Sequence, residues 1–246
     1  MTEESSSQHS LVKSIFLHLF PGMAITIFVL SFTPFLLTIG LTPEFGLLFG
    51  FILIGEPFQI GYMLYLAKRK NRKISLQGII MNREPQTKRN YFATPIFIVA
   101  VIFIISAITT PINIVLANTL FSWLPEWLLD SNPLLYTSSF LVIQMLFIFQ
   151  LIVDGIINPI IEEFYWRGFL LPRLSRYGVY SVLISGFLIA IQHFWQIYNI
   201  IFMIPISLLL SFIVYRYRNV YLSIIAHCSI NIISILVFYL GIFSNF

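Results

Sequence analysis

Charged side chains are scarce in this chain of 246 residues. Asp, Glu, Lys and Arg make up 10% of the residues, whereas 58% are hydrophobic. A soluble domain usually contains about 25% charged residues. So few charges cannot cover a water-soluble surface, so the composition excludes an ordinary soluble protein and predicts an integral membrane protein.

Cysteine is also scarce, and the features of a cleavable signal peptide are not visible. The single cysteine, Cys228, stands inside an apolar run, so an intrachain disulfide or a cysteine metal cluster cannot form within this sequence. The start, MTEESSSQHSLVK, is polar and acidic, which argues against a cleavable signal peptide. The net charge of +4 comes from basic residues in a few loops and does not indicate nucleic-acid binding.

What the chain has in abundance is apolar runs long enough to cross a bilayer, which takes about 20 helical residues. We assign them to 14–40, 45–67, 93–117, 136–171, 179–198, 199–215 and 220–243. The fourth is too long for one straight span and contains Gly155 and Pro159, which predict a kink or a break with a re-entrant portion. The predicted fold class is all-α: a polytopic membrane helix bundle of about seven (seven to eight) transmembrane helices, forming a single membrane-embedded domain over residues 1–246.

The basic residues predict the orientation in the cell membrane. Every Lys and Arg except Arg167 precedes the first run or follows the second, fourth or sixth. Positively charged loops stay in the cytoplasm, so the N-terminus is predicted to be cytoplasmic and the C-terminus outside. The KRKNRK stretch at 68–73 is interpreted as a topology anchor rather than a lipid-signalling patch. On the outer side, the segment 120–136 is predicted to be an interfacial helix with Trp123 and Trp127 at headgroup level.

One segment breaks the apolar pattern. NPIIEEFYWRGFLLPRL, at 158–174, places Glu162, Glu163 and Arg167 in the fourth run, although a charge at mid-membrane costs about 2.5–3.5 kcal/mol even on a lenient scale. Glu163 and Arg167 are four residues apart with the glutamate first, the favourable order for a helical ion pair, and are predicted to be the structural ion pair of the site. Glu162 lies about 100° around the helix, and a structural pair does not explain it.

Polar partners for Glu162 occur in two later runs. His193 belongs to the fifth run, and His227 and Asn231 are four apart in the last, so they share a helix face. Glu162 and His193 are at similar distances from the turn between their runs, so antiparallel helices would hold them at similar depth. We predict that Glu162, His193, His227 and Asn231 line a buried polar catalytic cavity. Three polar residues that stand alone in their runs are interpreted as helix-packing residues or secondary gates rather than catalytic groups: His18, Glu56 and Asp154.

These motifs resemble those of the CPBP intramembrane proteases, which comprise type II CAAX prenyl endopeptidases and bacteriocin-processing enzymes, also called the Abi family. EEFYWR is similar to the family signature E-E-x-x-x-R. The second motif ends in His193 and has Ile189 where the family usually has Phe. His227 and Asn231 fit the third motif, H-x-x-x-N/D. The resemblance covers about 150–235.

The resemblance implies an intramembrane endopeptidase that hydrolyses a peptide bond of a membrane-associated peptide or protein near the cytoplasmic side. Glu162 would activate water, His193 would position it, and His227 and Asn231 would donate hydrogen bonds to the oxyanion. The expected partners are that substrate and the lipid bilayer, without nucleic acid.

Two alternatives to this interpretation remain. No cofactor is the primary expectation, but Glu162, His193 and His227 also form a plausible zinc set for a metal-dependent version of the same protease. A non-enzymatic protein is the other alternative, either a transporter with a proton relay or a bacteriocin-immunity protein.

Overall fold

The computed structural model describes residues 8–130, 135 and 138–243. It is 83% helical, without strands in the described part of the chain. Six helices are long and apolar enough to cross a membrane, and a shorter apolar helix lies at Tyr180–Ile191. The predicted fold class, a polytopic helix bundle, is therefore confirmed.

The first half of the chain supplies three spans. Helix α1 is Leu11–Thr38, the second span joins α2 (Pro43–Gly50), the π-helical η2 (Phe51–Gly55) and α3 (Glu56–Asn71), and α4 is Lys88–Asn118. Ser10 and Thr87 cap α1 and α4, since each side-chain oxygen accepts a hydrogen bond from a backbone N–H of the first turn. These caps explain where the two helices begin.

The second half supplies the remaining helices. A four-residue helix, α5 (Glu126–Leu129), precedes a long span made of α7 (Phe140–Ile152), η3 (Val153–Ile157), α8 (Asn158–Glu163), η4 (Phe164–Leu170) and η5 (Leu171–Tyr177). Then follow α9 (Tyr180–Ile191), η6 (Phe194–Asn199), α10 (Ile200–Tyr217) and α11 (Tyr221–Phe243). The irregularity predicted near Gly155 and Pro159 is a π-helical stretch, η3, within a continuous span rather than a re-entrant break.

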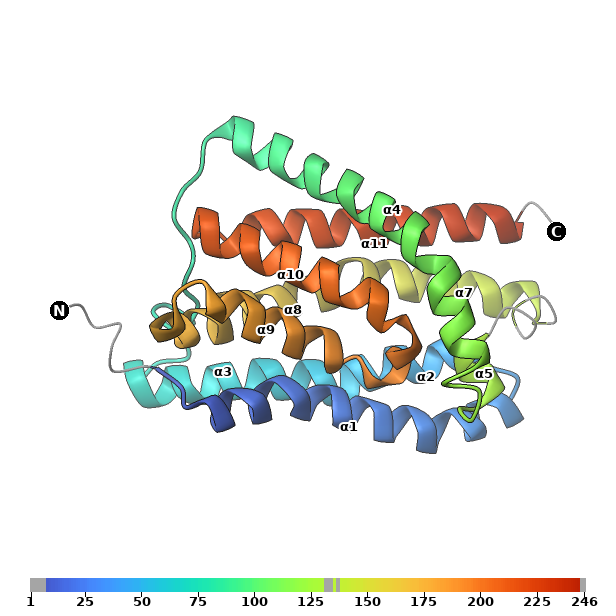
Figure 1. Ribbon diagram of the computed structural model, residues 1–246. Coiled ribbons are helices and arrows are strands. Elements are labelled where there is room, and N and C mark those ends of the chain that lie inside the picture. Colours follow the sequence, from blue (N-terminus) through green and yellow to red (C-terminus); the bar gives the residue numbers. More distant parts are fainter. Residues whose placement is uncertain (1–7, 131–134, 136–137, 244–246) are drawn as a thin grey trace.

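The helices lie side by side along one axis (Figure 1). In that view α8, α9 and α10 lie between the α1–α3 layer and α11, and α4 crosses α11 obliquely. Helix α4 packs against both α10 and α11. Gly186 permits the close packing of α9 on α10, because a Cβ there would lie 3.1 Å from the Cα of Leu208. Helix α1 begins at one end of the bundle, and α11 ends at the opposite end (Figure 1).

The predicted fifth span, 179–198, is wrong in its second half. Helix α9 has 12 residues, about 18 Å, which is short of the roughly 30 Å of hydrocarbon in a bilayer. His193 and Gln196 have non-helical backbone, and the chain turns there before α10 begins. Non-helical backbone is tolerated at membrane depth where it lines a cavity. The apolar pattern of the run does not show that these residues line one.

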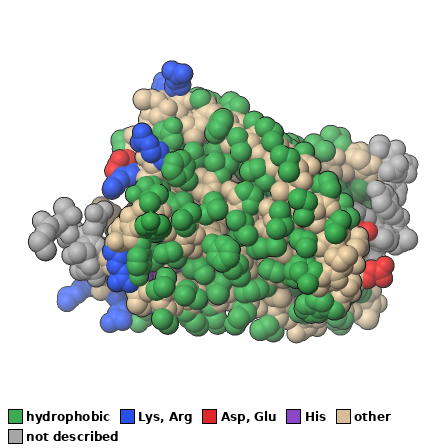
Figure 2. Space-filling model, in the orientation of Figure 1, with side chains coloured by type: hydrophobic (Ala, Val, Ile, Leu, Met, Phe, Trp, Pro, Cys, Tyr) green, Lys and Arg blue, Asp and Glu red, His purple; other side chains and the backbone are tan. Residues whose placement is uncertain are grey.

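Charge is distributed unevenly along the bundle axis. Lys and Arg gather at the end where α1 and α4 begin (Figure 2). This is the end that the positive-inside rule assigns to the cytoplasm, and the orientation stays a prediction. At the other end, the interfacial helix expected at 120–136 is helical over Glu126–Leu129, and 131–134 and 136 lie outside the described residues.

Candidate active site

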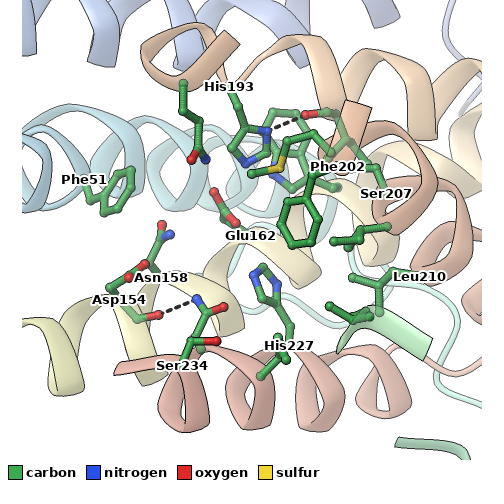
Figure 3. Close-up of a pocket in the computed structure, with 18 of the residues that line it drawn as sticks. Phe51, Asp154, Asn158, Glu162, His193, Phe202, Ser207, Leu210, His227 and Ser234 are labelled. Carbon is green, nitrogen blue, oxygen red and sulfur yellow. Dashed lines mark hydrogen bonds between the residues drawn. The ribbon is translucent and has the colours of Figure 1, made fainter. Parts of the chain in front are cut away.

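A cavity of about 290 Å³ lies in the middle of the bundle, enclosed mainly by α8, η6, α10 and α11. Its lining contains Glu162, His193, His227 and Asn231, together with Arg167. Figure 3 shows Glu162 between the rings of His193 and His227. The structure thus brings together side chains that are far apart in the sequence. They come from α8, from the end of α9 and from α11.

The remainder of the cavity lining is largely apolar. It is formed by helices α2, η2, α4 and α10, through residues that include Phe51, Ile102, Phe202, Met203 and Leu210. A polar group of a bound molecule would therefore find its partners on the α8 and α11 side. The apolar remainder of that molecule would pack against α4 and α10.

Glu162 and its neighbour Glu163 have different surroundings. Glu162 is 5% exposed and lines the cavity, and its carboxylate forms no hydrogen bond with the described residues. Glu163 is 0% exposed and its Oε1 accepts hydrogen bonds from Arg167 Nη1 and from His227 Nδ1, the latter at 3.0 Å. Of the two consecutive carboxylates, Glu163 is therefore engaged by Arg167 and His227, whereas Glu162 faces the cavity.

The sequence does not predict the contact between Glu163 and His227. It joins residues 64 positions apart, so no local spacing indicates it. Arg167 has a second partner, the backbone carbonyl of Ser207 on α10, at 3.5 Å from Nη2. The buried ion pair of η4 and α8 therefore also ties the neighbouring helices α10 and α11 to the cavity wall.

The ring of His193 is held at the end of α9. Its Nδ1 lies 2.7 Å from the carbonyl oxygen of Ile189. A carbonyl can only accept, so Nδ1 carries the proton and in the neutral ring the lone pair is on Nε2. The Gln192 amide nitrogen lies 3.3 Å from that Nε2. His193 thus caps the short helix and offers an acceptor nitrogen beside Glu162.

Asn231 links α11 to the irregular part of the long span. Its Nδ2 donates to the backbone carbonyl of Asp154 over 2.8 Å, in the π-helical η3. An amide nitrogen carries two N–H donors, and this bond uses one. The other N–H is available to a molecule in the cavity.

Two polar lining residues are not among the predicted site residues. The sequence predicts Asp154 to be an isolated residue and indicates no role for Asn158, yet both line the cavity with Glu162. The three are spaced four residues apart on one helix, a spacing that puts side chains on one face. That spacing is the signal that could have found them.

His18 and Glu56 lie outside the cavity lining. His18 is held by the Ser14 carbonyl at 2.7 Å and by the Ser185 hydroxyl at 3.0 Å, which suits the helix-packing role assigned to it. Glu56 is buried, and its Oε1 has no hydrogen-bond partner in the described structure.

The zinc alternative requires Glu162, His193 and His227 to come together around one ion, and it stays a prediction. In the described ranges of the chain, no group of three or more His, Cys, Asp or Glu side chains is arranged to hold a metal ion. The Nδ1 atoms of His193 and His227 are bound to the Ile189 carbonyl and the Glu163 carboxylate, which leaves the Nε2 atom of each ring for a metal. A metal would have to draw the remaining Nε2 atoms and Glu162 closer together.

Comparison with known proteins identifies the segment that holds this site. Residues 144–233 match the family model described as type II CAAX prenyl endopeptidase, Rce1-like. The matched segment includes every predicted site residue, and the match confirms the resemblance to the CPBP family. It supports a CAAX-type intramembrane endopeptidase in general. The chain matches no curated protein and no solved structure.

Proposed function

We propose that this Rce1-like membrane protein hydrolyses a peptide bond of a membrane-associated peptide or protein within the central cavity. The observation that carries the proposal is the convergence of Glu162, His193 and His227 on one cavity, although they come from three separate helices. Buried ionisable groups in a membrane are costly, and an uncompensated carboxylate beside two imidazoles suits proton transfer.

Glu162 is proposed to be the general base. Its carboxylate is free of hydrogen bonds to the described residues and faces the cavity, so it can bind a water molecule. As the water oxygen attacks the peptide carbonyl carbon, Glu162 takes a proton from it. The same proton is then delivered to the amide nitrogen as the C–N bond breaks. His193 Nε2 lies on the same side and would orient the water.

His227 and Asn231 are proposed to stabilise the oxyanion. His227 donates from Nδ1 to Glu163, so it can donate from Nε2 as well only when the ring carries both protons. The Glu163 carboxylate beside it favours that charged form, as a buried carboxylate does for a catalytic imidazole. Glu163 is therefore a positioning residue, and the remaining N–H of Asn231 completes the pair of donors.

The size and polarity of the cavity restrict the substrate. A volume of about 290 Å³ is at the lower end of ligand pockets, so it can enclose a short stretch of extended peptide and not a folded element. Apolar side chains of the substrate would lie against Phe202 and Leu210 of α10. The substrate class that fits is an unwound, largely apolar segment at the membrane.

Hydrolysis can be tested although the substrate is unidentified. Peptides from membranes of cells that make wild type, Glu162→Gln or Glu56→Gln are compared after incubation in ¹⁸O-labelled water. Wild type and Glu56→Gln should yield the same new C-termini, each with one ¹⁸O, and Glu162→Gln should not. Glu56 is the matched control because it is a buried intramembrane carboxyl outside the cavity lining. Identical peptides from all three would refute the proposal.

A further inference from the structure

A second hollow lies at the basic end of the bundle, away from the catalytic cavity. It has a volume of about 330 Å³ and lies between the start of α1, the end of α3 and η5. Four of its lining side chains are cationic, and none is acidic: Lys13, Arg69, Lys70 and Arg173. We call it the basic pocket.

The cations of the basic pocket are not neutralised by the described protein. Lys70 Nζ lies 3.3 Å from the Gly78 carbonyl and Arg69 Nη1 lies 3.2 Å from the Tyr65 hydroxyl. Both partners are uncharged. The ion pairs of the described residues involve Glu84 and Glu163 as acids, and neither lines this pocket. Among the residues that the structure describes, positive charge is therefore concentrated here without an acidic partner.

Arg173 forms the rigid floor of the pocket. Its side chain is 5% exposed, its guanidinium lies over the Phe169 ring at 4.0 Å, and its Nη1 donates to the carbonyls of Ile79 and Phe169. Nη2 and Nε make no hydrogen bond to the described residues. A buried arginine with unused donors is suited to bind phosphate oxygens.

His9 is a further buried group at the same pocket. It borders the hollow, and its Nδ1 is buried without a hydrogen-bond partner among the described residues. Burial, with Lys13 and Arg173 as further causes, lowers the pKa of its imidazole from 6.5 to about 3. Burial disfavours any charge on His9, and the two cations add to this, so His9 stays neutral and adds no charge to the pocket.

The surroundings of the pocket favour a lipid over a soluble anion. Phe16 lies one helical turn from Lys13 toward the middle of the bundle, and Tyr65 one turn from Arg69, and both are exposed on the bundle surface. Acyl chains of a lipid whose phosphate occupied the pocket would run over these rings. Basic pockets between transmembrane helices on the cytoplasmic side are known to bind lipid headgroups.

We propose that the basic pocket binds the phosphate headgroup of an anionic phospholipid, which bridges α1, α3 and η5. The KRKNRK stretch then has two functions. Arg69 and Lys70 line the pocket, whereas Lys68, Arg72 and Lys73 do not line it and act as the topology anchor alone. Since η5 continues the helical span that carries the catalytic glutamate, the bound headgroup would also stabilise that span.

The test measures lipid binding, independent of any proteolytic activity. Full-length protein in neutral detergent is titrated with phosphatidylglycerol or phosphatidylcholine, and bound lipid is counted by native mass spectrometry while the melting temperature is followed. The pocket variant is K13Q/R69Q/K70Q. The control, K68Q/R72Q/K73Q, removes the same number of charges at the same end of the bundle.

Wild type and the control should bind phosphatidylglycerol alike and melt at a higher temperature with it. The pocket variant should bind at least about tenfold more weakly, given the contribution of each lysine or arginine near a charged surface. If the triple variant does not fold, Arg69→Gln alone should show a weaker loss in the same direction.

Three outcomes would overturn the proposal. Equal weakening of the two triple variants would show a diffuse surface potential without a specific site. Equal binding of phosphatidylcholine would show that the headgroup charge is not recognised. Equal stabilisation by inorganic phosphate or glycerol 3-phosphate would show that the pocket takes a soluble anion.

Discussion

Removing the negative charge of Glu163 should destabilise the protein much more than removing that of Glu162. Glu163 is completely buried and is shared by Arg167 and His227, so Glu163→Gln leaves the arginine without its counter-ion. Breaking a buried ion pair by removing one partner costs roughly 3–5 kcal/mol. In a domain of this size each kcal/mol corresponds to about 2–4 °C, so the melting temperature should fall by roughly 6–20 °C.

Glu162→Gln is the matched variant, because it makes the same chemical change at the adjacent position. The Glu162 carboxylate has no hydrogen-bond partner among the described residues, so its melting temperature should equal or exceed that of wild type. Turnover should nevertheless fall by at least about 10²-fold, the lower range for the loss of a general base. Glu163→Gln should also lose activity in its folded fraction, because His227 is no longer oriented.

The assay combines thermal unfolding in detergent with cleavage of a peptide found in the membrane comparison. If the melting temperature of Glu162→Gln were lowered as much as that of Glu163→Gln, the assignment of Glu163 to the ion pair would be refuted. If Glu162→Gln kept near-normal turnover while Glu163→Gln lost it without loss of stability, the two roles would be reversed.

Three further predictions concern the metal, the packing and the topology. Cleavage should survive chelation and extensive dialysis; loss of cleavage that zinc restores would establish the metal-dependent alternative. Gly22→Ala should reduce activity although Gly22 is outside the cavity lining, because a Cβ there would lie 1.8 Å from the backbone oxygen of Gln192. The control is Gly61→Ala, whose Cβ would meet nothing within 4 Å and which should leave activity unchanged. Reporter fusions should place the loop 72–87 in the cytoplasm and the C-terminus outside, and a reporter that found both termini on one side would show an even number of crossings and contradict this topology.

Composition and local spacing determined the broad nature of the protein. With 10% charged residues the chain cannot cover a soluble surface, and a bilayer requires apolar helices of a known length, so most of the spans could be located directly. The ion pair between Glu163 and Arg167 follows from helical geometry alone, because residues four apart are neighbours on any α-helix.

Contacts between segments that are distant in the sequence could not be predicted from composition or local spacing. At the early end of α9 the His193 ring bonds back to Ile189 and residue 192 packs against Gly22, whereas the sequence resumes an apolar run a few residues later. Asp154 looked isolated along the chain, and only the packing of α11 against η3 brings Asn231 onto its carbonyl.

Sequence alone thus determined a helical membrane protein, its charged segment and the residue types available for chemistry. Tertiary structure alone decided that Glu163 holds His227, that Glu162 faces the cavity, and that Lys13, Arg69 and Arg173 surround one pocket. The physical reason is that hydrophobicity and helical periodicity act along the chain, whereas hydrogen bonds and charge pairs between helices depend on how the helices are rotated and packed against one another.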